Sequence, residues 1–272
     1  MKTADPRSLG FRDDWDVPEF SFIPIASRRH KTALVIPVIN EGQRLQKQLR
    51  QIQSLRAEVD VIIADGGSTD DSVSIDLLKN VGVTALLVKI GPGKLSAQLR
   101  MAYAWVLAAG YVGVVTVDGN GKDGVEAIPR FLVALDAGFD YVQGSRHIAG
   151  GQATNTPLDR YIANRFVHAP LVSLGARKWL TDTANGFRAY SARALLDPRV
   201  APFRHVFCNY SLLFYLSMRI SRLGYKVCEI PVSRCYPPAG KTPTKIAGFF
   251  GRLSLLRELL LAVSGGYNPG KT

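Results

Sequence analysis

Cysteine and long apolar runs are scarce in this sequence, and both absences narrow the class of protein. The 272 residues include three cysteines, Cys208, Cys228 and Cys235, which are odd in number and lack the spacing of metal ligands. A reduced, cytoplasmic setting with buried thiols is therefore expected. The amino terminus has no apolar signal region, and no stretch reaches the roughly 18 uninterrupted apolar residues of a membrane span. Neither a secreted nor an integral membrane protein is predicted.

Several nucleotide and metal motifs are missing as well. A dehydrogenase needs a glycine fingerprint after its first strand, and a sugar-nucleotide pyrophosphorylase needs a glycine-rich loop with Arg and Lys there; "VINEGQRLQ" has neither. The turn "GPGK", which contains Gly93 and Lys94, is no complete Walker loop. His30, His147 and His168 show no ligand spacing, and neither does His205, so packing or surface roles are expected.

The composition is that of a globular protein with a sizeable core. Hydrophobic residues make up 47% and charged residues 21% of the chain, which suits one large domain or two small ones. The formal net charge of +12 favours an anionic partner. A nucleotide, a nucleic acid or an acidic membrane surface would all fit, and charge alone does not choose among them.

Buried strands alternate with helices along most of the chain. The segments "TALVIPV", "VDVIIAD", "TALLVKI" and "YVGVVTVD" are continuous apolar runs, and amphipathic helical segments separate them. This alternation predicts an α/β fold with a largely parallel sheet and helices on both faces, whose ligands bind at the carboxyl ends of the strands. We expect an irregular extension over residues 1–30, a catalytic domain over 31–235 and a basic tail over 236–272.

The stretch "VTVDGNGKDG" places Asp118 and Asn120 just beyond a strand. Oxygen ligands at this spacing suit Mg²⁺ or Mn²⁺, which leave coordination positions open for substrate phosphates. An Asp-Gly/Asn-Gly surface turn explains the same residues equally well. The fragment alone leaves both interpretations open.

Three other strand ends carry polar side chains with two interpretations each. In "ADGGSTDD", Ser68 or Thr69 is expected to cap a helix, whereas Asp65 is left over and could accept a hydrogen bond from a nucleobase. Asn40 and Glu41 belong either to a helix start or to a ligand pocket. Arg146, in "QGSR", is either a surface residue or a diphosphate ligand with a planar fork of donors.

Six segments in this order resemble the inverting family-2 glycosyltransferases with the GT-A fold: "VIPVINE", "VDVIIADGGSTDDS", "VVTVDGNGKD", "DYVQGSR", "TDTANGFRAYS" and "LGYKVCEIPV". Within the family, the dolichyl- and polyprenyl-phosphate sugar synthases are most similar. The resemblance implies a nucleotide pocket formed by Pro37, Asn40, Glu41 and Asp65, to which we add Gly93 and Lys94. It also implies that Asp118 and Asn120 bind metal and diphosphate, that Arg146 and Arg188 contact phosphate, and that Asp182 faces the sugar or the acceptor.

The chain departs from the family at one metal position. Asp118-Gly119-Asn120 stands where the family usually has Asp-X-Asp, and a neutral ligand should hold a divalent cation less tightly. Asp123 is expected to supply the missing charge as a third metal ligand, or Lys122 to replace part of the metal by contacting phosphate. Mg²⁺ or Mn²⁺ remains the expected cofactor.

The resemblance implies transfer of a sugar from a UDP- or GDP-sugar to a polyprenyl or dolichyl phosphate with inversion. A phosphate acceptor needs no general base, and "FRHVFCNYSLLFYL" offers Asn209 but no carboxylate where a base is often found. A sugar or other hydroxyl acceptor, and a catalytically silent module that binds sugar nucleotides, remain alternatives.

The tail suggests where the protein acts. Cations at Lys241, Lys245, Arg252 and Arg257 alternate with apolar residues such as Leu253. Such a helix either lies on an anionic membrane or packs its apolar stripe on the sheet. We therefore expect peripheral contact with the cytoplasmic membrane face and no nucleic-acid partner, and we leave open whether a second copy binds.

Overall fold

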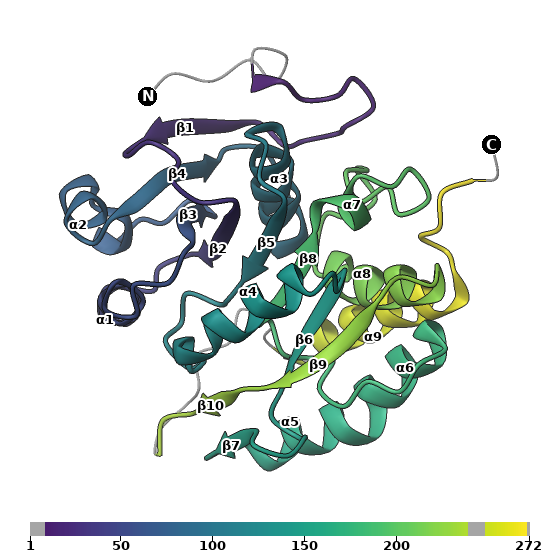
Figure 1. The fold of residues 1–272 in the computed structure, drawn as a ribbon. Coiled ribbons are helices and arrows are strands. Elements are labelled where there is room, and N and C mark those ends of the chain that lie inside the picture. The colour runs from purple at the N-terminus through teal and green to yellow at the C-terminus, as the bar shows by residue number, and fades with distance from the viewer. Residues whose placement is uncertain (1–8, 239–247, 271–272) are drawn as a thin grey trace.

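The computed structural model describes residues 9–238 and 248–270, and one large sheet runs through it (Figure 1). The sheet has eight strands, which lie side by side in this order: β1 (Phe20–Pro24), β4 (Val83–Lys89), β3 (Asp60–Asp65), β2 (Thr32–Val38), β5 (Gly113–Thr116), β8 (Arg188–Ser191), β6 (Tyr141–Ser145) and β9 (Val227–Pro231). A small second sheet pairs β7 (Gln152–Thr154) with β10 (Ser233–Cys235).

Most neighbouring strands of the large sheet are parallel, as the alternation predicted. The strand β2 pairs in parallel with β3 on one side and with β5 on the other, and β6 pairs in parallel with β9. The strand β1 is antiparallel to β4, and β8 is antiparallel to both β5 and β6. The carboxyl ends of β2, β3 and β5 therefore lie at one edge of the sheet.

Helices and short helical turns connect the strands. Their bounds are α1 (Gln43–Ser54), η2 (Asp71–Val73), α2 (Ile75–Asn80), α3 (Leu95–Ala108), η3 (Val125–Ala127), α4 (Ile128–Asp136), α5 (Leu158–Ile162), the π-helical η4 (Ala163–His168), α6 (Ala169–Ala176), α7 (Ala192–Leu195), α8 (Ser211–Arg222) and α9 (Gly248–Ser264).

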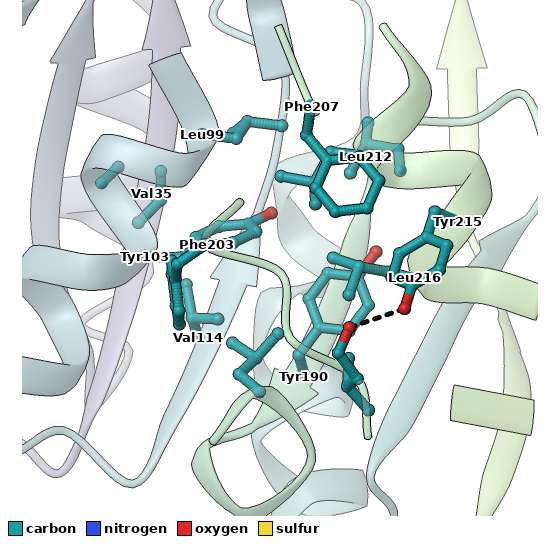
Figure 2. Close-up of a cluster of buried hydrophobic side chains, with 14 of the residues drawn as sticks. Val35, Leu99, Tyr103, Val114, Tyr190, Phe203, Phe207, Leu212, Tyr215 and Leu216 are labelled. Atoms are coloured by element: carbon teal, nitrogen blue, oxygen red, sulfur yellow. Dashed lines mark hydrogen bonds between the residues drawn. The ribbon is translucent and has the colours of Figure 1, made fainter. Parts of the chain in front are cut away.

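Both faces of the sheet are buried, which explains why the strands are continuous apolar runs. Along β2, Val35 belongs to the core beneath α3 and α8, whereas Leu34 and Ile36 belong to the core beneath α1 and α4. Figure 2 shows the first core, in which the ring of Tyr103 packs against that of Tyr190 and the ring of Phe207 against that of Tyr215. On the other face, Leu45, Leu49 and Ile52 of the amphipathic helix α1 are buried.

The sequence suggested an irregular amino-terminal extension, but part of this segment is regular. Residues Phe20–Pro24 form β1 and pair with β4, so part of the extension belongs to the sheet. Phe11 stacks on Phe20, and Trp15 packs against Phe203. The boundary expected at residue 30 therefore does not separate a loose extension from the domain.

The local structure holds two features that the sequence did not predict. The segment "TDTANGFRAYS" ends in a strand, because Arg188–Ser191 form β8 in the middle of the sheet. Neither Ser68 nor Thr69 caps a helix; instead, the Asp70 carboxylate accepts a hydrogen bond from the backbone N–H of Ser72 and caps η2. The Ser68 hydroxyl instead hydrogen-bonds to Asp65 and to the backbone N–H of Asn40.

The carboxyl-terminal helix packs on other helices. The helix α9 lies beside α8 and α6 (Figure 1), and Leu259 is buried there. Leu253 and Leu260 remain about half exposed, at 52% and 48%. Of the cations expected in the tail, Lys241 and Lys245 lie outside the described residues. Within the described ranges, no helix is long and apolar enough to cross a bilayer.

Candidate active site

Side chains tie together the loops that follow β2 and β3. Gln98 of α3 donates hydrogen bonds through Nε2 to the carbonyl oxygens of Val38 and Ala64, at 2.9 and 2.5 Å. Asn40 has a positive φ of 51°, and its Oδ1 accepts a hydrogen bond from the N–H of Thr69 at 2.8 Å. The backbone N–H of Asn40 donates to Oγ of Ser68 at 3.0 Å. These hydrogen bonds therefore hold together the two loops that carry the predicted nucleotide-side residues Asn40 and Asp65.

Asp65 has a structural role that sequence reasoning did not foresee. Its carboxylate is buried and accepts hydrogen bonds from the N–H groups of Gly67 and Ser68 and from the Ser68 hydroxyl. The turn after β3 is thus built around this carboxylate. A carboxylate has about four lone-pair sites, so contact with a nucleobase would have to share them.

Of the other predicted nucleotide-side residues, Pro37 lies in β2, whereas Glu41 and the pair Gly93 and Lys94 lie on two different loops. Glu41 receives two hydrogen bonds from Arg44, three residues later, the shorter at 2.9 Å. Gly93 has a φ of 105°, a conformation that favours glycine, and the exposed Lys94 places its Nζ 5.6 Å from the ring centre of Tyr210. Their contact with a nucleotide stays a prediction.

The loop that carries Asp118 is held from two sides. Gln48 of α1 donates through Nε2 to the carbonyl oxygen of Asp118 at 2.9 Å, and its Oε1 accepts from the N–H of Gly121 at 3.0 Å. On the other side, a Cβ added to Gly186 would lie only 2.4 Å from Oδ1 of Asp118. A side chain at position 186 would therefore displace this carboxylate, and glycine leaves room for it where the loop before β8 approaches.

Arg234 is the main residue of this site that sequence reasoning missed. Its Nη1 donates to both carboxylate oxygens of Asp123 at 2.7 and 2.6 Å, and its Nη2 lies 3.3 Å from Oδ2 of Asp118. Arg234 belongs to β10, far from Asp118 in the sequence. In the sequence, Arg234 is marked only by its position in a basic stretch directly after the segment "LGYKVCEIPV".

A cluster of cations surrounds Tyr236 next to Asp118. Nζ of Lys122 lies 5.3 Å from the ring centre, and Cζ of Arg160 and Cζ of Arg234 each lie 5.6 Å from it. Burial and the nearby Arg234 lower the pKa of Lys122. An anion bound among these side chains would relieve their mutual repulsion, so the cluster is suited to a phosphate group.

Arg146 and Asp182 form one unit instead of acting as two separate groups. Nε and Nη2 of Arg146 donate to the two oxygens of Asp182 at 2.6 and 2.7 Å, and Nδ2 of Asn164 donates to the same carboxylate at 2.8 Å. Burial raises the pKa of Asp182, but the hydrogen bonds and charge of Arg146 outweigh it and lower the pKa to about 2. Asp182 is fully buried. It is therefore placed to position Arg146 and not, as expected, to face the sugar or acceptor.

Arg188 also differs from its expected role. Its guanidinium is buried and donates to the carbonyl oxygens of Asn185, Leu213 and Thr183 at 2.6 to 2.8 Å. The same group donates to the Ser217 hydroxyl at 2.8 Å. These contacts connect β8 to α8 inside the core. We correct the expectation of a phosphate contact to a structural role for Arg188.

The residues around Asp118 fit a divalent cation in part. Asp118 is partly exposed, with 28% of its side chain accessible, and Nδ2 of Asn120 lies 3.3 Å from its Oδ2. Oδ1 of Asn120 accepts a hydrogen bond from the N–H of Lys122 at 3.2 Å, so the amide would have to turn for its oxygen to join Asp118 as a ligand of a hard cation. Asp123 is a poor third ligand, because its carboxylate is buried and both of its oxygens accept hydrogen bonds from Arg234. Among the described residues, no three His, Cys, Asp or Glu side chains gather as ligands.

Comparison with known proteins gives relatives of similar length. The chain is 27% identical over 214 residues to a polyprenol monophosphomannose synthase of Mycolicibacterium smegmatis, an alignment that covers 75% of this chain and 77% of the relative. It is 29% identical to an undecaprenyl-phosphate mannosyltransferase of Micrococcus luteus, covering 73% and 81%. A dolichyl-phosphate hexose transferase of Haloferax volcanii is 28% identical, covering 74% and 81%.

Solved structures agree in fold. Glucosyl-3-phosphoglycerate synthase from Mycobacterium tuberculosis, crystallised with Mn²⁺, UDP and glucosyl-3-phosphoglycerate, superposes with a TM-score of 0.60 at 18% identity, covering 89% of this chain and 82% of that one. No family model matches the chain. The resemblance recognised from the six motifs is nevertheless confirmed: the chain has the GT-A fold, and its sequence is similar to those of polyprenyl-phosphate sugar transferases.

Proposed function

We propose that this chain transfers a sugar from a UDP- or GDP-sugar to a polyprenyl or dolichyl phosphate, with inversion at the anomeric carbon. The relatives named above act on polyprenyl or dolichyl phosphates according to their names. The observation that carries the proposal is the joint position of Asp118 and the cation cluster around Tyr236. A carboxylate for a metal and several cations for phosphates are what this reaction needs at one place.

Two anionic groups must be held during the reaction. The donor diphosphate gains charge as the sugar leaves, and preorganised cations that stabilise developing charge are usually the largest catalytic contribution. Lys122 and Arg234 are close enough to Tyr236 and Asp118 to serve this purpose. Arg146, fixed by Asp182, supplies a further cation directly after β6.

The state of the nearby carboxylates favours a phosphate acceptor. Asp182 has a lowered pKa of about 2 and is bound by Arg146, so it is a poor proton acceptor at neutral pH. Asp123 is buried and bound by Arg234. A sugar hydroxyl would require a general base, whereas a lipid phosphate is largely ionised at neutral pH and attacks without one.

The bond changes are simple. An oxygen of the lipid phosphate forms a bond to the anomeric carbon from the face opposite the leaving group. The bond between that carbon and the β-phosphate oxygen breaks, and its electron pair leaves with the nucleoside diphosphate. One displacement inverts the anomeric configuration, and no proton has to be removed from the acceptor.

Mg²⁺ or Mn²⁺ would be held by Asp118 and Asn120 together with the diphosphate, and when bound it would neutralise charge on the leaving group. The neutral Asn120 and the nearby guanidinium of Arg234 both reduce the negative charge available to the ion. In a site with two carboxylates, the metal would supply all of this positive charge. Here Arg234 supplies part of it.

The location that follows from this substrate is the cytoplasmic membrane face, because a polyprenyl chain lies in the bilayer while nucleotide sugars are dissolved in water. The test is to incubate the purified protein with a panel of UDP- and GDP-sugars and Mg²⁺ or Mn²⁺, with and without polyprenyl phosphate. We expect nucleoside diphosphate and glycosylated lipid in equal amounts, and neither with Asp118→Asn.

Three results would change the proposal. Release of diphosphate only with a sugar or other hydroxyl acceptor would leave the glycosyltransferase and remove the lipid acceptor. Binding of a sugar nucleotide without turnover for any acceptor would indicate the silent module. Retention of the anomeric configuration in the lipid product would contradict a single displacement.

A further inference from the structure

The exposed face of the segment 158–179, which comprises α5, η4, α6 and the three residues after them, is unusually apolar. Seven large apolar side chains on it are exposed: Leu158, Tyr161, Ile162, Phe166, Val167, Leu174 and Trp179. The accessible fraction is 72% for Leu158 and 70% for both Phe166 and Leu174. Single exposed apolar residues are ordinary, but a contiguous group indicates an interaction surface. We call these seven residues the apolar face.

The regular spacing of these residues places many of them along one side of the helices. Leu158, Ile162 and Phe166 are separated by steps of four residues, which lie on the same side of an α-helix. The π-helical turn η4 holds more residues per turn than an α-helix and lies within this run. Leu174 continues the series after two further steps of four.

Positive charge accompanies the apolar face. Of the four cations in the segment, Arg177 and Lys178 are exposed, whereas Arg160 and Arg165 are half-buried and contact Tyr236 and Thr181; the single acid is Asp159. Arg177, Lys178 and Trp179 are exposed together at its carboxyl end. Large apolar side chains with cations beside them are the composition of helices that lie in the interface of an anionic bilayer, where tryptophan is also favoured.

The buried side of the same segment contacts the candidate active site. Asn164 donates a hydrogen bond to Asp182, and Nη1 of Arg165 donates to the carbonyl oxygen of Thr181 at 3.2 Å. Nδ1 of His168 lies 2.7 Å from the Thr183 hydroxyl. One segment therefore has an exposed apolar side and a buried side that holds the loop positioning Arg146.

We propose that the apolar face is the surface by which this protein docks on an anionic lipid bilayer, so that the bilayer delivers its acceptor beside Arg146 and Tyr236. The lipid-phosphate acceptor in this statement rests on the proposed function, whereas the docking itself does not. A second copy of the chain is a poorer occupant, because a two-fold contact would bring these cations against themselves.

Docking is tested by sedimentation with vesicles of phosphatidylcholine, with and without phosphatidylglycerol. Leu158→Ser, Phe166→Ser and Leu174→Ser are combined in one variant, and Val112→Ser, Val133→Ser and Val206→Ser in a control of similarly exposed residues. We expect binding that requires phosphatidylglycerol, a loss of roughly tenfold or more in the first variant, and no change in the control. Thermal unfolding checks that both variants fold.

A second readout does not depend on the triple variant. Trp179 is 60% exposed, whereas Trp15 and Trp105 are partly buried in the core. Brominated lipids in the vesicles are expected to quench the tryptophan fluorescence of the wild type. Trp179→Phe should remove most of this quenching while vesicle binding persists in part.

Several outcomes would overturn the docking surface. These are no vesicle binding by the wild type, equal binding by the apolar-face variant, an equal loss in the control, or no quenching through Trp179. So would a loss caused only by Leu253→Ser with Leu256→Ser and Leu260→Ser, which would assign docking to α9. If docking depends on the apolar face but no lipid phosphate is glycosylated, the proposed function fails and the docking surface stands.

Discussion

The guanidinium of Arg234 lies beside the carboxylate of Asp118, with Nη2 3.3 Å from Oδ2. The same side chain is fixed by Asp123, whose buried carboxylate takes both hydrogen bonds from Nη1. A positive charge therefore stands permanently next to the oxygens that would bind a metal. A divalent cation and Arg234 repel each other, and a diphosphate between them would attract both.

Metal and diphosphate should therefore bind cooperatively. We expect Mn²⁺ alone to bind weakly, and its affinity to rise by roughly tenfold in the presence of the cognate nucleoside diphosphate, within the usual range of coupling between two ligands. Isothermal titration of Mn²⁺ with and without UDP or GDP measures this directly. Arg234→Gln should tighten the binding of Mn²⁺ alone; weaker binding in that variant would contradict the repulsion.

Asp118→Ala should remove turnover without unfolding the protein. The side chain is partly exposed at a loop, so its loss costs little packing. The reaction loses its only carboxylate contact with the proposed metal, and a decrease in kcat of at least roughly 10²-fold is expected. Steady-state kinetics and thermal unfolding are the two measurements. Full activity in this variant would exclude Asp118 from the site.

Variants of the pair formed by Arg234 and Asp123 can test the effect on stability separately from the effect on activity. Arg234→Gln leaves a buried carboxylate without its partner and should lower the free energy of unfolding by about 3–5 kcal/mol. Asp123→Asn combined with Arg234→Gln removes both charges and should restore most of that loss in urea unfolding. Turnover should stay low in the double variant, because the cation beside Asp118 is still absent. Normal turnover there would make the pair purely structural.

Gln48 is expected to act through the loop it holds. Gln48→Leu keeps the size of the side chain but leaves the carbonyl of Asp118 and the N–H of Gly121 without these partners, at a cost of about 1–3 kcal/mol. We expect a raised KM for the nucleotide sugar and a lower kcat. Gln53→Leu, on the same helix, loses one surface hydrogen bond to Asn80 and is the matched control. Equal effects of the two changes would argue against positioning by Gln48.

His168 predicts a specific loss of stability in acid. Burial lowers its pKa from 6.5 to about 3, so the unfolded chain takes up a proton before the folded protein does. The contribution of His168 to the free energy of unfolding is complete above pH 6.5 and is lost as the pH falls from there towards 3. The free energy of unfolding changes by at most about 1.4 kcal/mol per pH unit in this range. Urea unfolding across this range should show a shallower slope for His168→Gln than for the wild type.

The local pattern of apolar residues was sufficient to predict the strands and helices whose neighbours lie close in the sequence. The apolar run of β2 and the inward face of α1 could be predicted because their periodicity reports burial directly. The strands β1 and β8 could not, because each is short and becomes a strand only by pairing with distant residues. Arg188 interrupts the apolar pattern of β8, and a buried arginine that is satisfied by carbonyl groups looks like a loop residue in the sequence.

The same distinction holds for the candidate site. Strand ends located Asn40, Asp65 and Asp118, because a parallel sheet gathers them at one edge. Arg234 comes from another sheet, and its pairing with Asp123 depends on the fold. Gln48 did leave a signal, since it is a polar residue on the buried face of α1. The directions of Arg146 and Asp182 depend on side-chain contacts that strand order does not determine.

The position of β8 has a consequence for how the chain is made. The central strand β5 pairs with it from Gly113 to Thr116, against residues 188–191. During synthesis, one side of β5 therefore has no partner strand until the chain is long enough to include Ser191. An unpaired apolar strand edge is prone to associate with other chains. Nascent chains that stop between β6 and β8 should aggregate or recruit chaperones, although they already contain most of the residues proposed to bind the nucleotide.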